Sequence, residues 1–185
     1  EAFRSDATVD SIIDVALSLA KDGTHDAISA VVKGAKKHKD WKNAIGPLRD
    51  IIRPYDGSAE FGKARGDGTN NWRPSREHSI EELPIALAFI VIADGKSEES
   101  IFGAANYGRD NDSIAGMAGG IMGALNGAHK IRNDWIETIN RSNRIDLDPL
   151  AENLYKLVLK LQKLQLNQSK KRDDDFSRLK KVVIK

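Results

Sequence analysis

The sequence contains no cysteine among its 185 residues. Disulfide bonds, thiolate catalysis and cysteine-ligated zinc are therefore excluded. No apolar run approaches the roughly 20 residues that cross a bilayer, because the longest, Leu83–Ala93, is short and contains Pro84. The net charge is only +2, from 29 Lys and Arg against 27 Asp and Glu, which is too near balance for a chain-wide nucleic-acid surface. We expect neither a membrane nor a specific nucleic acid as partner.

Several catalytic motifs are also missing. The four histidines are scattered and form no His-Glu-x-x-His, and there is no Gly-x-Ser-x-Gly, so zinc-protease and serine-hydrolase chemistry are not supported. An EF-hand loop that began at Asp110 would need glycine at its sixth position and glutamate at its twelfth. The chain has Ala115 and Ile121 there, which excludes that calcium site.

What the sequence does contain is helical periodicity over nearly its whole length, and 185 residues fit one domain. We predict an all-α fold, a compact bundle of many helices, with Thr8 capping the first of them. Pro47 predicts a kink or a break in the third helix. The helix after Ser79 is apolar nearly all round, which places it deep in the core. The predicted helices cover residues 9–20, 25–37, 41–52, 79–93, 97–106, 113–127, 135–139 and 150–164.

The composition divides the chain into a helical domain over residues 1–166 and a charged tail over residues 167–185. The tail holds seven Lys/Arg and three Asp, a net charge of +4, and we expect it to be solvated. Leucines form an apolar stripe between Leu150 and Leu164. We expect this stripe to pack on the chain's own core, and a coiled coil with a partner is the alternative.

Residues 53–78 have no apolar period and are rich in glycine, proline and asparagine. Such a long loop inside a compact domain is usually functional or disordered. Trp72, Arg73 and Arg76 favour a binding loop. By their position in it, Glu77 and His78 are further candidates to line a pocket.

One segment concentrates oxygen donors where a turn leads into a helix. Asp110, Asp112 and Ser113 place two carboxylates at i and i+2 beside a hydroxyl. Such hard donors suit Mg²⁺, Mn²⁺ or Ca²⁺. The alternative is a helix N-cap with acidic companions, which needs no metal. The same spacing recurs at Asp146 and Asp148, where capping of the next helix is a sufficient explanation.

The helix behind this acidic turn is rich in glycine, each of which costs about 1 kcal/mol in a helix interior relative to alanine. Gly119, Gly123 and Gly127 share one face at i, i+4. We therefore expect a neighbouring helix to approach closely along this face and to hold the acidic turn rigidly. Gly116 and Gly120 also lie on this helix.

The segment 108–115, followed by Gly119–Ala124, resembles the signature of the ADP-ribosylglycohydrolase family. That signature is a Gly-x-Asp-x-Asp-Thr/Ser turn before a helix rich in alanine and glycine. The upstream segment Ser79–Leu87 is similar to the helix that usually precedes it, and Trp135 stands about where the family often has a tryptophan. The resemblance covers roughly residues 79–140.

The resemblance implies an all-α hydrolase that cleaves an N- or O-glycosidic bond of an ADP-ribosyl or related nucleotide or nucleoside ribosyl substrate. It also implies two divalent ions, usually Mg²⁺ but in some cases Mn²⁺, with Asp110, Asp112 and Ser113 as ligands. Paired cations can hold ribose hydroxyls and a water while the sugar gains positive charge during cleavage. The residues before the acids are expected to contact the substrate, a ribosyl small molecule or an ADP-ribosylated partner; they are Asn106, Tyr107, Gly108 and Arg109.

The signature is not matched at every position. The commoner form has glycine where Arg109 stands and threonine where Ser113 stands, and serine keeps the ligating oxygen. Arg109 is expected either to reach a substrate phosphate or to pair with a nearby acid. A substrate smaller than protein-linked ADP-ribose is favoured by its presence. The resemblance assigns no general base in this chain.

The N-terminal half of the family carries a Thr-Asp-Asp cluster, which supplies the other metal ligands and an acidic catalytic residue. Nothing in residues 1–52 matches that cluster, and the chain begins at Glu1 rather than Met. We therefore expect a C-terminal fragment or one chain of a two-chain enzyme, with the missing N-terminal half as its partner. The alternative is a catalytically inactive helical module that binds nucleotide-ribosyl groups or a protein partner.

These residues alone are expected not to complete the dinuclear site. In an assay with an ADP-ribosyl substrate and Mg²⁺ or Mn²⁺, the isolated chain should release no more product than the metal-free control. Robust metal-dependent turnover would contradict this expectation.

Overall fold

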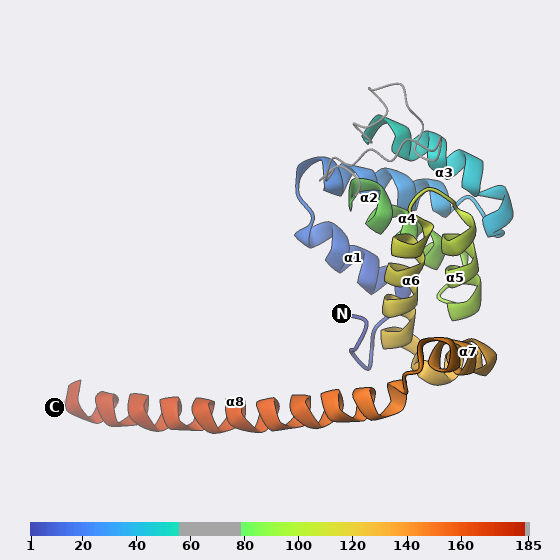
Figure 1. The fold of residues 1–185 in the computed structure, drawn as a ribbon. Helices are drawn as coiled ribbons and strands as arrows, with labels where there is room; N and C mark the ends of the chain where they lie inside the picture. Colours follow the sequence, from blue (N-terminus) through green and yellow to red (C-terminus); the bar gives the residue numbers. More distant parts are fainter. Residues whose placement is uncertain (56–78, 184–185) are drawn as a thin grey trace, which may run out of the picture. The chain divides into compact units, whose positions relative to one another are not determined.

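The computed structural model describes residues 1–55 and 79–183, and no strand occurs within these ranges. The described residues form eight α-helices (Figure 1), which confirms the predicted all-α fold. The chain divides into two compact units, Glu1–Asn133 and Asp134–Lys185. The helices are α1 (Val9–Leu19), α2 (Asp22–Ala35), α3 (Ile45–Ile52), α4 (Ser79–Ile92), α5 (Ser97–Asn106), α6 (Asn111–Asn126), α7 (Asn133–Asn143) and α8 (Leu147–Val183).

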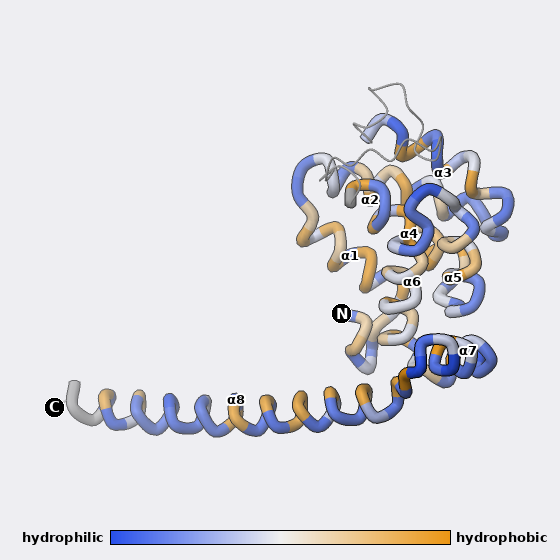
Figure 2. Tube along the Cα trace, in the orientation of Figure 1, coloured by the Kyte–Doolittle hydropathy of each residue, from blue (hydrophilic) through white to orange (hydrophobic). Residues whose placement is uncertain are grey.

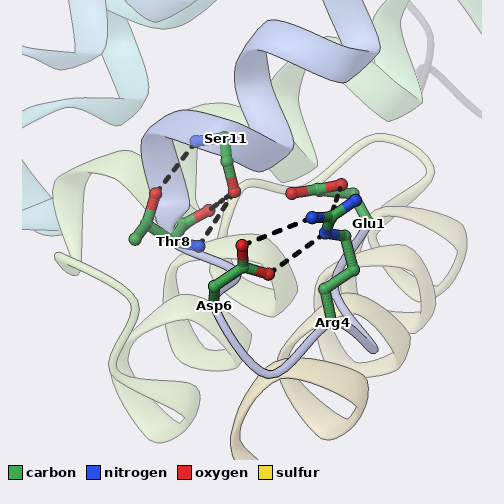
Figure 3. Close-up of polar contacts among 5 residues, drawn as sticks. All are labelled: Glu1, Arg4, Asp6, Thr8 and Ser11. Carbon is green, nitrogen blue, oxygen red and sulfur yellow. Dashed lines mark hydrogen bonds and ion pairs between the residues drawn. The ribbon is translucent and has the colours of Figure 1, made fainter.

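The first helix begins where the sequence predicts. The Thr8 hydroxyl accepts a hydrogen bond of 3.0 Å from the Ser11 backbone N–H, and the Ser11 hydroxyl accepts one of 2.9 Å from the Thr8 N–H. This reciprocal cap satisfies two N–H groups that α1 itself cannot pair (Figure 3). An exposed ion pair between Arg4 and Asp6, 3.1 Å long, lies just before it.

The predicted third helix is interrupted, as Pro47 suggested, although not at the proline. A short 3₁₀ turn over Trp41–Asn43 precedes α3, and Ala44 separates the two. Pro47 lies in the first turn of α3, where the missing N–H costs no intrahelical hydrogen bond. The break therefore falls before the proline.

α4 is the central helix of the first unit. Every residue from Ile85 to Ile90 is at most 1% exposed, and the helix packs against α2, α5 and α6. Because its neighbours cover it on several sides, the helix is apolar nearly all round, as predicted. Its residue Leu87 also joins a second apolar cluster, in which α1 contributes Ile12 and Ile13.

The predicted close approach of a neighbouring helix is wrong at Gly119 and Gly123, and Gly127, the C-cap of α6, has a left-handed φ of 79° and a Cβ added there would meet His129. A Cβ added at Gly119 would lie 3.8 Å from Ile101, and one at Gly123 would lie 3.9 Å from Ile131. Both distances are ordinary van der Waals contacts, so neither position requires glycine for space. The i, i+4 spacing identifies residues that share a face, but it does not show what lies opposite them.

Tight glycine contacts lie on α2 and α5 instead, at Gly34 against Ile51 and at Gly103 against Phe89. A Cβ at Gly103 would collide with the ring of Phe89, a buried residue of α4. In contrast, nothing lies within 4 Å of a Cβ added at Gly116 or Gly120. The close approach that positions α5, and the turn that follows it, is therefore the contact between Gly103 and Phe89.

In the second unit, α8 continues without interruption from Leu147 to Val183, so the domain boundary expected after residue 166 falls inside a helix. The leucines between Leu150 and Leu164 are not covered by other residues of this unit, and the expectation that they pack on the chain's own core stays a prediction. Their spacing identifies the apolar face correctly, but spacing alone cannot show what covers that face.

The predicted binding loop lies largely outside the described residues. The loop residues proposed to bind or to line a pocket all fall between residues 56 and 78, outside the described ranges. They are Trp72, Arg73, Arg76, Glu77 and His78. Within the described ranges, no helix combines the length and the apolar character that crossing a membrane requires.

Two alanine substitutions test the assignment of the glycine contacts. Gly103→Ala should lower the free energy of unfolding by about 1–3 kcal/mol, because the new methyl group overpacks the core against Phe89. Gly120→Ala should raise it by about 0.5–1 kcal/mol, because alanine favours a helix and meets open space. Urea denaturation measures both values. Equal effects of the two substitutions would contradict the assignment.

Candidate functional site

The acidic turn lies between α5 and α6, at the start of a helix that is rooted in the core. Gly108 and the residue after it, Arg109, both have left-handed backbone conformations, with φ of 79° and 58°. Glycine adopts this conformation freely, but a residue with a Cβ does so at a cost of about 1–2 kcal/mol. Contacts elsewhere must therefore hold Arg109 in place.

The principal contact of Arg109 is a buried carboxylate on α4. The Arg109 Nε lies 2.7 Å from Oε1 and donates a hydrogen bond of 2.9 Å to Oε2 of Glu81. Glu81 is only 1% exposed, and Tyr107 donates a second hydrogen bond of 3.0 Å from its hydroxyl to Oε1. A buried carboxylate needs such compensation. One side chain of α4 thus anchors both ends of the Tyr107–Arg109 segment.

Tyr107 is fully buried, edge-on to Phe89 with 6.0 Å between ring centroids. The Arg49 guanidinium lies 5.3 Å from the centre of the tyrosine ring, and its Nη2 donates to the Tyr107 carbonyl oxygen. Burial raises the pKa of the Tyr107 phenol well above its usual range, and the charge of Glu81 raises it further. The phenol therefore stays protonated and donates to Glu81.

The expected metal ligands come together at the start of α6. Asp110 occupies the N-cap position, and its backbone carbonyl accepts a hydrogen bond of 3.1 Å from the Ile114 N–H. Its side chain, however, makes no capping hydrogen bond to the helix. Asp112 is exposed in the first turn of the helix, and Ser113 beside it is half-buried.

The second Asp-x-Asp pair behaves differently. Asp146 accepts a hydrogen bond of 3.2 Å from the Asp148 backbone N–H, so its carboxylate is used at the start of α8, as expected from the sequence. Two segments with the same spacing therefore have different local chemistry. Capping accounts for the carboxylate of Asp146, whereas the carboxylate of Asp110 does not cap its helix.

The residues expected to contact a substrate have distinct environments. Asn106 is exposed at the end of α5 and bonds within its own helix, to the Phe102 carbonyl at 2.9 Å. Gly108 and Arg109 form the left-handed turn and are partly exposed. Tyr107 has no exposed surface, so its role is to support the turn.

Of the two alternatives for Arg109, the structure supports pairing with a nearby acid. The reason for favouring a small substrate is thereby weakened, because this charge already has a partner within the fold. Glu81 and Arg49 were not identified from the sequence. For Glu81 a signal existed: it precedes the buried residues Ile85 and Ala88 by one and two turns, so it is an acid on an apolar helix face.

The donor set fits a hard divalent cation in chemistry, since every ligand is a carboxylate or hydroxyl oxygen. It is not a complete site. Among the described residues, no three His, Asp or Glu side chains lie close enough together to hold a metal ion. Asp110, Asp112 and Ser113 can therefore be only part of a coordination shell.

Comparison with known proteins gives two findings. The family model described as ADP-ribosylglycohydrolase matches residues 2–163, well beyond the segment in which the sequence motifs lie. A protein of Archaeoglobus fulgidus, described as uncharacterized, is 39% identical over 89 residues, which make up 47% of this chain and 28% of that protein. The aligned part thus spans about a quarter of the relative's length. No solved structure matches the chain.

The anchoring role of Glu81 can be measured by substitution. Glu81→Gln should lower the free energy of unfolding by about 3 kcal/mol, because it leaves Arg109 without its buried counter-charge. Tyr107→Phe should lower the free energy of unfolding by about 1.5–3 kcal/mol, because it removes a hydrogen bond to a charged group. Urea denaturation followed by circular dichroism provides both values.

A surface pair in the same unit serves as the matched control. Glu98 lies 3.5 Å from Arg132, and both side chains are more than 40% exposed. Glu98→Gln should change the free energy of unfolding by less than about 1 kcal/mol. If Glu81→Gln were no more costly than Glu98→Gln, the anchor would not exist as described.

Proposed function

Because this chain belongs to the ADP-ribosylglycohydrolase family, we propose that it acts in the metal-dependent hydrolysis of a glycosidic bond. Membership of the family supports an enzyme of the glycosyl-hydrolase kind. The finer proposal is that the substrate is an ADP-ribosyl or related nucleotide or nucleoside ribosyl compound. We further propose that this chain supplies the Asp-x-Asp-Ser half of a dinuclear Mg²⁺ site, which Mn²⁺ could also occupy.

The observation that carries the metal proposal is that two carboxylates and a hydroxyl, those of Asp110, Asp112 and Ser113, stand together at the start of α6. At the start of a helix, an aspartate normally accepts a hydrogen bond from the exposed N–H groups, as Asp146 does at α8. Asp110 occupies the same position at α6 without making this bond. Its carboxylate stands two residues from the exposed carboxylate of Asp112, beside the Ser113 hydroxyl.

A divalent cation held by these oxygens would supply Lewis-acid polarisation and an anchor for ribose hydroxyls and water. The chain's own contribution is to fix the ligands. Mg²⁺ demands near-ideal octahedral geometry, so its ligands must be held in place. The turn before the ligands is held by Glu81 of α4, which accepts hydrogen bonds from both Tyr107 and Arg109. The N-terminus of α6 adds a partial positive charge that favours anionic substrate groups nearby.

The rest of the coordination shell is proposed to come from donors outside the described residues. The described part of the chain offers no third carboxylate or imidazole at this site. Both the undescribed stretch 56–78 and a separate polypeptide segment could contribute it. Either source is compatible with the proposed role of Asp110, Asp112 and Ser113.

The metal proposal is tested by calorimetric titration with Mn²⁺ and Mg²⁺. We expect Asp110→Asn and Asp112→Asn each to weaken binding at least about tenfold, since each removes a charged ligand. The matched controls are Asp146→Asn and Asp148→Asn, which alter the other Asp-x-Asp pair and should leave the affinity unchanged. Equal effects of all four substitutions would contradict a specific site at the acidic turn.

A second titration separates the hydrolase from the alternative of an inactive binding module. Binding of ADP-ribose should require Mn²⁺ or Mg²⁺ and should be lost with Asp112→Asn, because metal-held ribose hydroxyls anchor the ligand. Binding of equal strength in the presence of a chelator would favour the module.

A further inference from the structure

An arginine of α3 brings a second positive charge to the acidic turn. Arg49 is exposed, and its Nη2 donates a hydrogen bond to the Tyr107 carbonyl oxygen. Its guanidinium lies over the Tyr107 ring, 5.3 Å from the ring centre. Among the described residues, no carboxylate forms an ion pair with Arg49. Its charge is therefore available to an anionic ligand.

The side chain of Arg49 is held at both ends. At its base, α3 is rooted in the core by Leu48 and Ile52, which are 0% and 2% exposed, and Figure 2 shows that the same helix also carries hydrophilic residues. At its tip, the guanidinium contacts the ring and the carbonyl of Tyr107, which is fully buried. A side chain that is positioned in advance loses less freedom when it binds a ligand.

The guanidinium also lies against Gly108, two residues before Asp110. A Cβ added at Gly108 would lie 2.9 Å from the Arg49 Nη2, so the missing side chain leaves room for the arginine. Two residues of chain span at most about 7 Å. Arg49 therefore presents its charge close to the first of the proposed metal ligands.

The two arginines at this turn differ in what they can bind. The charge of Arg109 is paired with Glu81, 2.7 Å away. A guanidinium carries five N–H donors in a planar fork that matches the oxygens of a phosphate. The contacts of Arg49 with Tyr107 use one N–H donor, on Nη2, and the face of the guanidinium. Further donors of Arg49 thus remain for a phosphate.

We propose that Arg49 binds the phosphate attached to the ribosyl group of the substrate, and that it thereby selects nucleotides over nucleosides. The inference rests on the proposed function, in which cations at Asp110 and Asp112 hold the ribose hydroxyls. In a nucleotide the 5′-phosphate is bonded to the same sugar as those hydroxyls. A residue that binds this phosphate must therefore lie near the metal ligands, as Arg49 does.

The test compares AMP with adenosine, which differ only in the 5′-phosphate, by calorimetric titration of the full chain in the presence of Mn²⁺. Wild type should bind AMP at least about tenfold more tightly than adenosine, because charge-assisted hydrogen bonds to phosphate are strong. Arg49→Gln should weaken AMP binding at least about tenfold and leave adenosine binding unchanged. Arg49→Lys keeps the charge but loses the planar fork, and its affinity for AMP should lie between the two.

The matched control is Arg53→Gln. Arg53 is an exposed arginine one turn further along the chain, and its charge is paired with Asp50 at 3.1 Å. This substitution should change neither affinity, so a loss of AMP binding equal to that of Arg49→Gln would overturn a specific role for Arg49.

A titration with Mn²⁺ alone separates failure of this inference from failure of the proposed function. If wild type binds Mn²⁺ but does not prefer AMP, the role of Arg49 is overturned and the metal site stands. If Arg49→Gln weakens AMP and adenosine binding equally, Arg49 only supports the turn, which also overturns the inference. A chain that binds no Mn²⁺ would overturn the proposed function, and this inference with it.

Discussion

The candidate site depends on the buried carboxylate of Glu81. A charge that is 1% exposed is tolerated only when hydrogen-bond donors compensate it. Its donors, Tyr107 and Arg109, lie in the turn that presents the acidic residues. The same interaction therefore satisfies the buried carboxylate on α4 and holds the turn that precedes α6. If it is lost, a buried charge is left uncompensated and a left-handed residue is left without its anchor.

This interaction also explains a departure from the commoner signature, which has glycine where Arg109 stands. The backbone there is left-handed, with φ of 58°, a conformation for which glycine is the ordinary choice. Arginine accepts the backbone cost because its guanidinium meets Glu81. Arginine at this position thus loses the conformational freedom of glycine and gains an ion pair with Glu81. Its presence is explained without a contact to a substrate phosphate.

Periodicity predicted the helices well because the apolar faces of α1 to α6 are buried within one unit. The inward residues of α2 include Ile28 and Val31, which are fully buried. Periodicity failed where the prediction depended on which other element packs against a helix face. The spacing of the α6 glycines did not show that open space or ordinary contacts lie opposite them, and only the structure locates the tight contact at Gly103. Likewise, the sequence identified Asp110 but not Glu81. The two residues are separated by 28 others, and only the packing of α4 brings Glu81 to the turn before Asp110.

The two Asp-x-Asp pairs show why a motif must be interpreted through its local geometry. Spacing is identical, and each pair stands at the start of a helix. At α8 the first carboxylate bonds to a backbone N–H nearby, which gives it a structural role. At α6 the first carboxylate makes no such bond, while the turn before it is fixed to the core by Glu81. The two pairs thus share a spacing but not a hydrogen-bonding role at the start of their helices.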